Sequence, residues 1–187
     1  DWSSDVCSSD LIRENWFEVN DNSHLKRRES LSKQLGAHNL TEPIKNYINN
    51  SKPVNKALLA GKSHHDVDSI DEFIENNKLP TKLHVYSALG KNAHQALIDQ
   101  NQTPTYLSTT PHKDVAKGYA VKSDDGYHHI AHIVLSPNSS ATHLGGHENE
   151  VLIDRGQKLQ YHGTRIVKEG EKNYKVHKLD RKSTRLN

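Results

Sequence analysis

Residues 147–156 read His-Glu-Asn-Glu-Val-Leu-Ile-Asp-Arg-Gly, with two carboxylates two positions apart directly before an apolar run. The Val-Leu-Ile run predicts a buried strand. On a strand, residues i and i+2 share a face and lie roughly 7 Å apart, so we expect Glu148 and Glu150 to point to the same side of the chain. Two acids held in this way can contact one substrate at two different atoms. The alternative interpretation is a pair of solvated acids at the entrance of a strand.

The composition is that of a polar chain with a single domain. Its 187 residues are enough for one hydrophobic core. Mean hydropathy is −0.87, 26% of the residues are charged, and no apolar run approaches transmembrane length. The net charge is only +2 with the 14 histidines counted as neutral, so the chain has no basic stripe. We therefore expect neither nucleic acid nor a membrane as its partner.

The two ends of the chain look foreign to the rest. Residues 1–11 and 181–187 resemble the translated adapter sequence that caps open reading frames in environmental assemblies, and we exclude both from the fold prediction. The predicted domain is therefore 12–180. The single cysteine, Cys7, lies in the excluded segment, so the domain is expected to use neither disulfides nor thiol chemistry. The sequence contains no methionine, and we expect the native N-terminus to lie upstream.

The periodicity divides this domain into a helical part, 12–79, and a β-rich part, 80–180. In the helical part we expect three short amphipathic helices, the first capped by Thr41. Their apolar faces are Ile44-Tyr47-Ile48, Val54-Leu58-Leu59 and Ile70-Phe73-Ile74. In the β-rich part we expect strands at 82–87, 105–110, 128–135 and 150–153, short helices at 94–98 and 114–120, a loop or short strand at 141–144, and a closing hairpin around Gly170.

This order of elements and its motifs resemble the mono-ADP-ribosyltransferases of the Arg-Ser-Glu class. The shared pattern is helices, a strand, a Ser-Thr-Thr strand, a strand that ends in Pro, and Glu-x-Glu-Val-Leu-Ile-x-Arg-Gly, over about residues 42–180. The class includes bacterial toxins and enzymes of tailed phages. The resemblance implies an α+β fold in which N-terminal helices precede two small packed β-sheets that form a cleft for NAD. It also implies NAD as substrate, a host protein as partner, and action in the host-cell cytoplasm by a phage-encoded, injected or secreted enzyme.

The resemblance assigns different roles to the two acids. Glu150 matches the glutamate that contacts the 2′-hydroxyl of the nicotinamide ribose and stabilises an oxocarbenium-like transition state as nicotinamide leaves. A preorganised anion suits this role because positive charge develops at the anomeric carbon. Glu148 matches the residue that engages the acceptor, where Glu accompanies arginine targets. A carboxylate can hold a guanidinium in bidentate fashion and assist the loss of its proton. The implied reaction is transfer of ADP-ribose to a protein arginine.

The Ser-Thr-Thr strand supplies further predicted site residues. Ser108 matches the first serine of the family's Ser-Thr-Ser strand, whose hydroxyl positions the catalytic glutamate by hydrogen bonding. Thr109 and Thr110 follow it, and we predict that they line the NAD site together with Tyr86. Out of this context, Ser-Thr-Thr is simply a strand with hydroxyl groups before a proline turn.

The sequence departs from the family at the first predicted strand. The family usually has Val-Tyr-Arg-Gly there, and its arginine anchors an NAD phosphate; this chain has Val-Tyr-Ser-Ala, so Ser87 stands in place of the arginine. A serine can donate one hydrogen bond to a phosphate, but it has neither the positive charge nor the paired N–H donors of an arginine. By strand alternation, His84 lies on the opposite face from Ser87. Lys82, Lys91 or a later basic residue is therefore the candidate to compensate.

Three other functions compete with the transferase. A metal site on His128 and His132 is not expected, because on a strand they lie about 13 Å apart, too far to share one ion. The two that stay open both keep the same cleft. One is an NAD glycohydrolase, in which Glu150 acts with water as the acceptor. The other is a catalytically inactive binding module, for instance a structural or injected phage protein, in which the serine at position 87 has ended catalysis.

Overall fold

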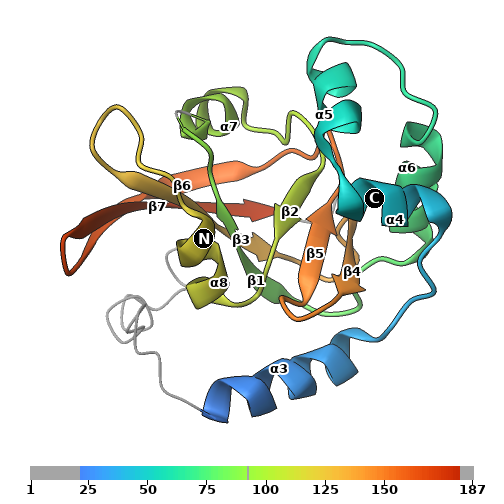
Figure 1. The fold of residues 1–187 in the computed structure, drawn as a ribbon, viewed down its shortest axis with the longest axis horizontal. Helices are drawn as coiled ribbons and strands as arrows, with labels where there is room; N and C mark the ends of the chain where they lie inside the picture. The colour runs from blue at the N-terminus through green and yellow to red at the C-terminus, as the bar shows by residue number, and fades with distance from the viewer. Residues whose placement is uncertain (1–21, 92, 182–187) are drawn as a thin grey trace, which may run out of the picture.

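The computed structural model describes residues 22–91 and 93–181 and places helices outside two β-sheets (Figure 1). Within these residues, four helices precede the first strand: α3 (Asn22–Leu35), α4 (Glu42–Asn49), α5 (Lys52–Leu59) and α6 (Val67–Asn76). The sequence predicted only the last three. It missed α3 because that helix is mostly polar and presents no continuous apolar stripe. None of the helices in the described residues has the length and apolar character needed to cross a bilayer.

The short helices contact the sheets through a narrow face. Thr41 is the N-cap residue of α4 as predicted, with a proline in the first turn, although its side chain makes no capping hydrogen bond. Ile44 and Tyr47 are buried, but Ile48 is 43% exposed and Leu59 of α5 is 69% exposed. The predicted faces were too wide because an eight-residue helix has only about two turns with which to contact a flat surface.

The larger sheet has the strand order β1-β3-β7-β6. Its strands are β1 (Leu83–Ala88), β3 (His128–Leu135), β6 (Gln160–Glu169) and β7 (Lys172–Arg181). The predicted closing hairpin is confirmed, since β6 and β7 pair antiparallel around Gly170, whose φ is +56°. β7 also pairs in parallel with β3. Arg181 ends β7, whereas 1–11 and 182–187 lie outside the described residues.

The smaller sheet is antiparallel with the order β2-β5-β4. Its strands are β2 (Leu107–Thr109), β4 (Ala141–Gly145) and β5 (Glu150–Ile153). Two short helices, α7 (His94–Gln100) and α8 (Lys113–Tyr119), occupy the connections before β2 and after it. Both helices lie where the sequence predicted them.

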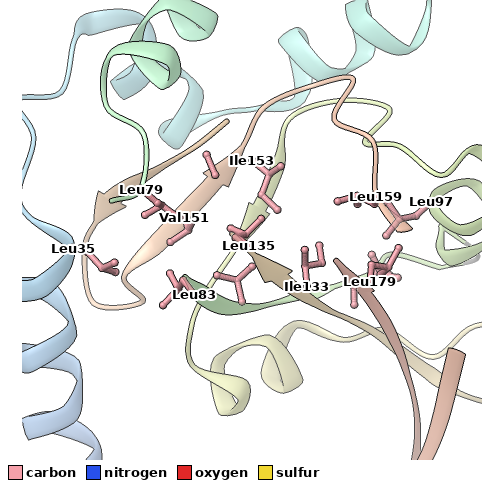
Figure 2. Close-up of a cluster of buried hydrophobic side chains, with 14 residues drawn as sticks. Leu35, Leu79, Leu83, Leu97, Ile133, Leu135, Val151, Ile153, Leu159 and Leu179 are labelled. Atoms are coloured by element: carbon pink, nitrogen blue, oxygen red, sulfur yellow. The ribbon is translucent and has the colours of Figure 1, made fainter. Parts of the chain in front are cut away.

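The main core lies between the two sheets (Figure 2). It joins Leu83, Ile133, Leu135 and Leu179 of the larger sheet to Val151 and Ile153 of the smaller one. Each such side chain, when fully buried, stabilises the fold by about 1.5–3 kcal/mol. Helices α4 to α6 cover the other face of the smaller sheet, and α8 covers the other face of the larger one. The predicted α+β architecture with two packed sheets is confirmed.

The two sheets also meet along one backbone contact. The N–H of Tyr86 in β1 donates to the carbonyl of Thr110 at 2.7 Å, and the N–H of Thr110 donates to the carbonyl of Tyr86 at 2.9 Å. This contact fixes the end of β2 against β1. Residues from both sheets therefore converge at one point of the surface.

Candidate active site

A cleft of about 260 Å³ opens where β1 meets β2. Its lining contains every site residue predicted from the sequence: Tyr86, Ser87, Ser108, Thr109, Thr110, Glu148 and Glu150. Sequence reasoning did not name the other lining residues, which are Ala88, Val115, Ala116 and Tyr119. Three of these four belong to α8, which forms the opposite wall of the cleft.

Glu150 is the first residue of β5; it is half-buried and lines the cleft. The hydroxyl of Ser108 on the neighbouring strand forms a hydrogen bond with its carboxylate. Burial raises the pKa of Glu150, the nearby charge of Glu148 raises it further, and the Ser108 bond acts in the opposite direction. Ser108 pairs in register with Leu152, so Ser108 and Glu150 both face the helical side of the small sheet.

Tyr47 of α4 completes this group and was not predicted as a site residue. Its phenol is hydrogen-bonded to Asn55 Oδ1 at 3.2 Å and also to the side chain of Ser108. Burial is the main reason that the pKa of Tyr47 is raised to about 12, and the charge of Glu150 contributes to the shift. At neutral pH the phenol therefore keeps its proton. In the sequence, Tyr47 is indistinguishable from a core residue of an amphipathic helix, and it is indeed 2% exposed.

Glu148 does not lie on β5, which corrects the prediction that the two acids alternate along one strand. The strand begins at Glu150, and Glu148 belongs to the preceding turn, in which Asn149 has a φ of +46°. A residue in the left-handed region interrupts the extended alternation. Glu148 nevertheless lines the cleft, and its Oε1 accepts a hydrogen bond of 2.7 Å from the phenol of Tyr119 on α8.

The two threonines after Ser108 bind the main chain around the acids. Thr109 Oγ1 donates to the carbonyl of Val151 at 2.6 Å, and Thr110 Oγ1 donates to the carbonyl of Glu148 at 2.6 Å. Each hydroxyl has a single proton, so these bonds use its donor capacity. The threonines thereby hold β2 against the segment that carries both carboxylates. Their contact with NAD stays a prediction.

Ser87 has a similar internal bond. It is 5% exposed, and its hydroxyl donates to the carbonyl of Ser108 at 2.9 Å. While that bond is made, Ser87 has no proton left to donate to a phosphate. Its neighbour Tyr86 stacks on His132 with ring centroids 4.6 Å apart, and the ammonium of Lys113 lies 5.6 Å from the centre of the Tyr86 ring.

Comparison with known proteins finds its matches among structures alone. No family profile and no curated protein matches the sequence. An ADP-ribosyltransferase from Clostridium botulinum aligns with a TM-score of 0.57 and 15% identity, over 87% of this chain and 97% of its own. Plx2a, an ADP-ribosyltransferase toxin from Paenibacillus larvae, gives 0.55 and 14%, over 84% and 90%. The ADP-ribosylating toxin BECa of C. perfringens, solved with NADH, gives 0.50 and 19%, over 83% and 44%. The chain has the fold of bacterial ADP-ribosyltransferase toxins.

Within the described part of this ADP-ribosyltransferase fold, Lys113 lies beside the cleft-lining Tyr86. His84 lies on the other face of β1, as alternation predicted, with its Nδ1 2.9 Å from His132 Nε2. Lys91 forms an ion pair with Asp124 at 2.9 Å, and Lys82 is exposed outside the cleft lining. Lys113 opens α8 and reaches the Tyr86 ring, so it is better placed than either lysine to approach a negatively charged group in the cleft.

Among the described residues of this ADP-ribosyltransferase fold, no histidine lines the cleft. His132 contacts His84, whereas His128 packs against Tyr174, so these two do not form a joint site. His94, Asp125 and His129 do have ligand atoms within 4.8 Å of one another. The rings of His94 and His129 are parallel with centroids 3.6 Å apart, so their in-plane lone pairs do not converge on one point. The ammonium of Lys175, 3.5 Å from Asp125, further disfavours a cation there.

Proposed function

We propose that this protein is an NAD-dependent mono-ADP-ribosyltransferase that modifies a protein arginine. The observation that carries the proposal is the convergence of Glu150, its hydrogen-bonded partner Ser108, and Glu148 in one cleft. The fold of the ADP-ribosyltransferase toxins and the NADH in the BECa structure support NAD as the substrate. A host protein as acceptor, and the host cytoplasm as the place of reaction, belong to the same proposal.

In the proposed reaction, Glu150 acts on the nicotinamide ribose. The bond between the ribose anomeric carbon and the nicotinamide nitrogen breaks, and its electron pair leaves with nicotinamide. The carboxylate of Glu150, held by Ser108, stabilises the positive charge that develops on the ribose. A preorganised anion of this kind typically lowers the barrier by several kcal/mol because it needs no reorganisation during the reaction.

Glu148 acts on the acceptor in this proposal. It would bind the guanidinium in bidentate fashion and take up the proton released when a guanidinium nitrogen bonds to the anomeric carbon. In the free protein its carboxylate is hydrogen-bonded to the phenol of Tyr119. Tyr119 lines the cleft and is 64% exposed. An arriving arginine would therefore exchange with Tyr119 for this carboxylate.

The same contact favours a second candidate function, the NAD glycohydrolase. While Tyr119 occupies Glu148, water is the acceptor with access to the ribose, so hydrolysis is expected whenever no protein acceptor is bound. The inactive binding module is the third candidate, and the internal bond of Ser87 to Ser108 is the observation that favours it.

Nicotinamide release from NAD tests these candidates directly. The assay compares the protein, Glu150→Gln and the control Glu171→Gln, which changes an exposed acid in the β6–β7 turn, with and without agmatine. We expect Glu150→Gln to lower release by about 100-fold or more, and Glu171→Gln to leave it unchanged. Release stimulated by agmatine supports the transferase, and release indifferent to it supports the glycohydrolase. No release at millimolar NAD would refute both enzymes.

A further inference from the structure

We propose that Asn149, between the two acids, is a positioning residue that fixes the separate positions of the Glu148 and Glu150 carboxylates in the cleft. The proposal rests on the proposed function, because it assigns the partition between acceptor transfer and hydrolysis to a buried hydrogen-bond chain beneath the turn. The chain runs from His112 through Asn149 and His143 to the main chain of Gly36.

The backbone of the turn explains why this position takes an asparagine. Gly145, Gly146 and Asn149 all have positive φ, at +86°, +77° and +46°, and the N–H of Asn149 donates to the carbonyl of Gly146 at 3.2 Å. Most residues avoid the left-handed region, and asparagine is the non-glycine residue that enters it most readily. The left-handed conformation at position 149 is what turns Glu148 off the strand direction of Glu150.

The side chain of Asn149 is enclosed, unlike an ordinary turn asparagine. It is 2% exposed, and its amide lies between His143 of β4 and His112 after β2, with a distance of 3.1 Å to the Nε2 of each. The two histidines are also buried, at 2% and 4% exposure. His143 Nδ1 donates to the carbonyl of Gly36, just after α3, at 2.7 Å. The amide therefore links both neighbours of β5 to the helical part of the chain.

The hydrogen-bonding capacities show why an amide fits this place. The amide oxygen Oδ1 of Asn149 faces His143 Nε2, and its Nδ2 faces His112 Nε2. An amide has both an acceptor and a donor, so it can accept a hydrogen bond from one imidazole and donate one to the other. An apolar side chain would take this hydrogen bond away from both imidazoles.

The main chain of the turn is fixed from the same side. Thr110 Oγ1 donates to the carbonyl of Glu148 and accepts from the N–H of His112 at 3.1 Å. His112 thus holds the turn twice, through the Asn149 amide and through Thr110. Removing the amide should free Glu148 more than Glu150, because Glu150 stays paired with Gly145 of β4 and bonded to Ser108.

The test uses Asn149→Gly, which keeps the left-handed backbone and removes only the amide. The matched control is Asn138→Gly, since Asn138 also has a positive φ, of +63°, but is exposed in the turn before β4. We expect Asn149→Gly to lower the ratio of agmatine transfer to NAD hydrolysis by at least about tenfold, with the KM for NAD nearly unchanged, because small displacements of a reacting group are costly. Asn149→Asp keeps an acceptor for both imidazoles, so its ratio of transfer to hydrolysis should lie between those of Asn149→Gly and Asn138→Gly.

Equal ratios of agmatine transfer to NAD hydrolysis in Asn149→Gly and Asn138→Gly would overturn the proposal. Amide hydrogen exchange of residues 145–150 supplies a readout that needs no activity. If the wild-type protein releases no nicotinamide, the proposed function fails, and exchange alone decides the structural part of the inference. Faster exchange in Asn149→Gly than in Asn138→Gly would then support the positioning of the turn, and unchanged exchange would refute it.

Discussion

The two sheets handle buried ionisable groups in opposite ways. The smaller sheet places the carboxylate of Glu150 at the edge of a cleft, where Ser108 bonds to it and Glu148 lies nearby. The larger sheet encloses imidazoles: the ring of His129 is parallel to those of His94 and His177, with centroids 3.6 and 5.0 Å away. Burial raises the pKa of Glu150 and, with the neighbouring histidines, lowers the pKa of His177 to about 4.

Both shifts favour the neutral form, but their consequences differ. Glu150 is open to solvent and substrate, so its charge can serve chemistry at the cleft. His129 and His177 are hydrogen-bonded to one another and to Asp125 and Thr164, so we expect them to serve the packing of the sheet. Substitutions of Glu148 and Glu150 should therefore change activity with little loss of stability, whereas substitutions of these histidines should do the reverse.

The largest expected effect sharpens this comparison at Glu148. Glu148→Gln removes the charge that would bind and deprotonate a guanidinium, while the turn and the Tyr119 contact can persist. We expect transfer to agmatine to fall by about 100-fold and acceptor-free nicotinamide release to fall by less than about threefold. The thermal midpoint should stay within about 2 °C. Equal losses in transfer and hydrolysis would contradict the separate roles of the two acids.

The next prediction concerns His177 and acid stability. Its pKa of about 4 in the folded protein lies below the ordinary value of 6.5, so the unfolded chain binds more protons between these two values. Stability from this group is complete above pH 6.5 and is lost as the pH falls towards about 4, by up to about 3 kcal/mol. Urea unfolding at pH 7 and pH 4.5 measures the loss.

His177→Gln provides the variant for that measurement, because glutamine can hydrogen-bond to Thr164 and His129 without titrating. We expect the free energy of unfolding to depend less on pH in this variant than in the wild type. Exposed His147, changed to glutamine, is the control and should leave the pH dependence as it is. If His177→Gln stays folded but loses nicotinamide release, the proposed division between a catalytic smaller sheet and a structural group of histidines is wrong.

A smaller effect is expected at Lys113, which we propose as the cation that serves the phosphates of NAD in this chain. It lies 5.6 Å from the centre of the Tyr86 ring at the cleft wall. Losing one charged hydrogen bond to a phosphate should raise the KM for NAD by about tenfold with little change in kcat. Lys113→Gln is compared with Lys122→Gln, an exposed lysine after α8. An unchanged KM would mean that another group binds the phosphates, and it would refute this assignment.

The sequence predicted the type and order of most elements because their apolar patterns were strong, as in the helix with Ile70, Phe73 and Ile74 and the strand His128–Leu135. It could not give the parallel pairing of β3 with β7, which joins segments far apart in the chain. Strand alternation placed Glu148 wrongly because the left-handed Asn149 ends the extended backbone. Tyr47 was missed as a partner of Ser108 because its helical spacing is that of an ordinary core residue.

The smallest predicted effect separates the two influences on Glu150. Its catalytic role needs the ionised form, so acceptor-free nicotinamide release should fall as the pH drops through the raised pKa of Glu150. Glu148→Gln removes a like charge and should move this acid limb to lower pH. Ser108→Ala removes the hydrogen bond that favours the carboxylate and should move the limb to higher pH. Rate profiles between about pH 4.5 and pH 8, taken where each variant stays folded, measure both shifts. If neither limb moves, the raised pKa of Glu150 arises from burial alone, and Glu148 and Ser108 act on the ribose site only through its shape.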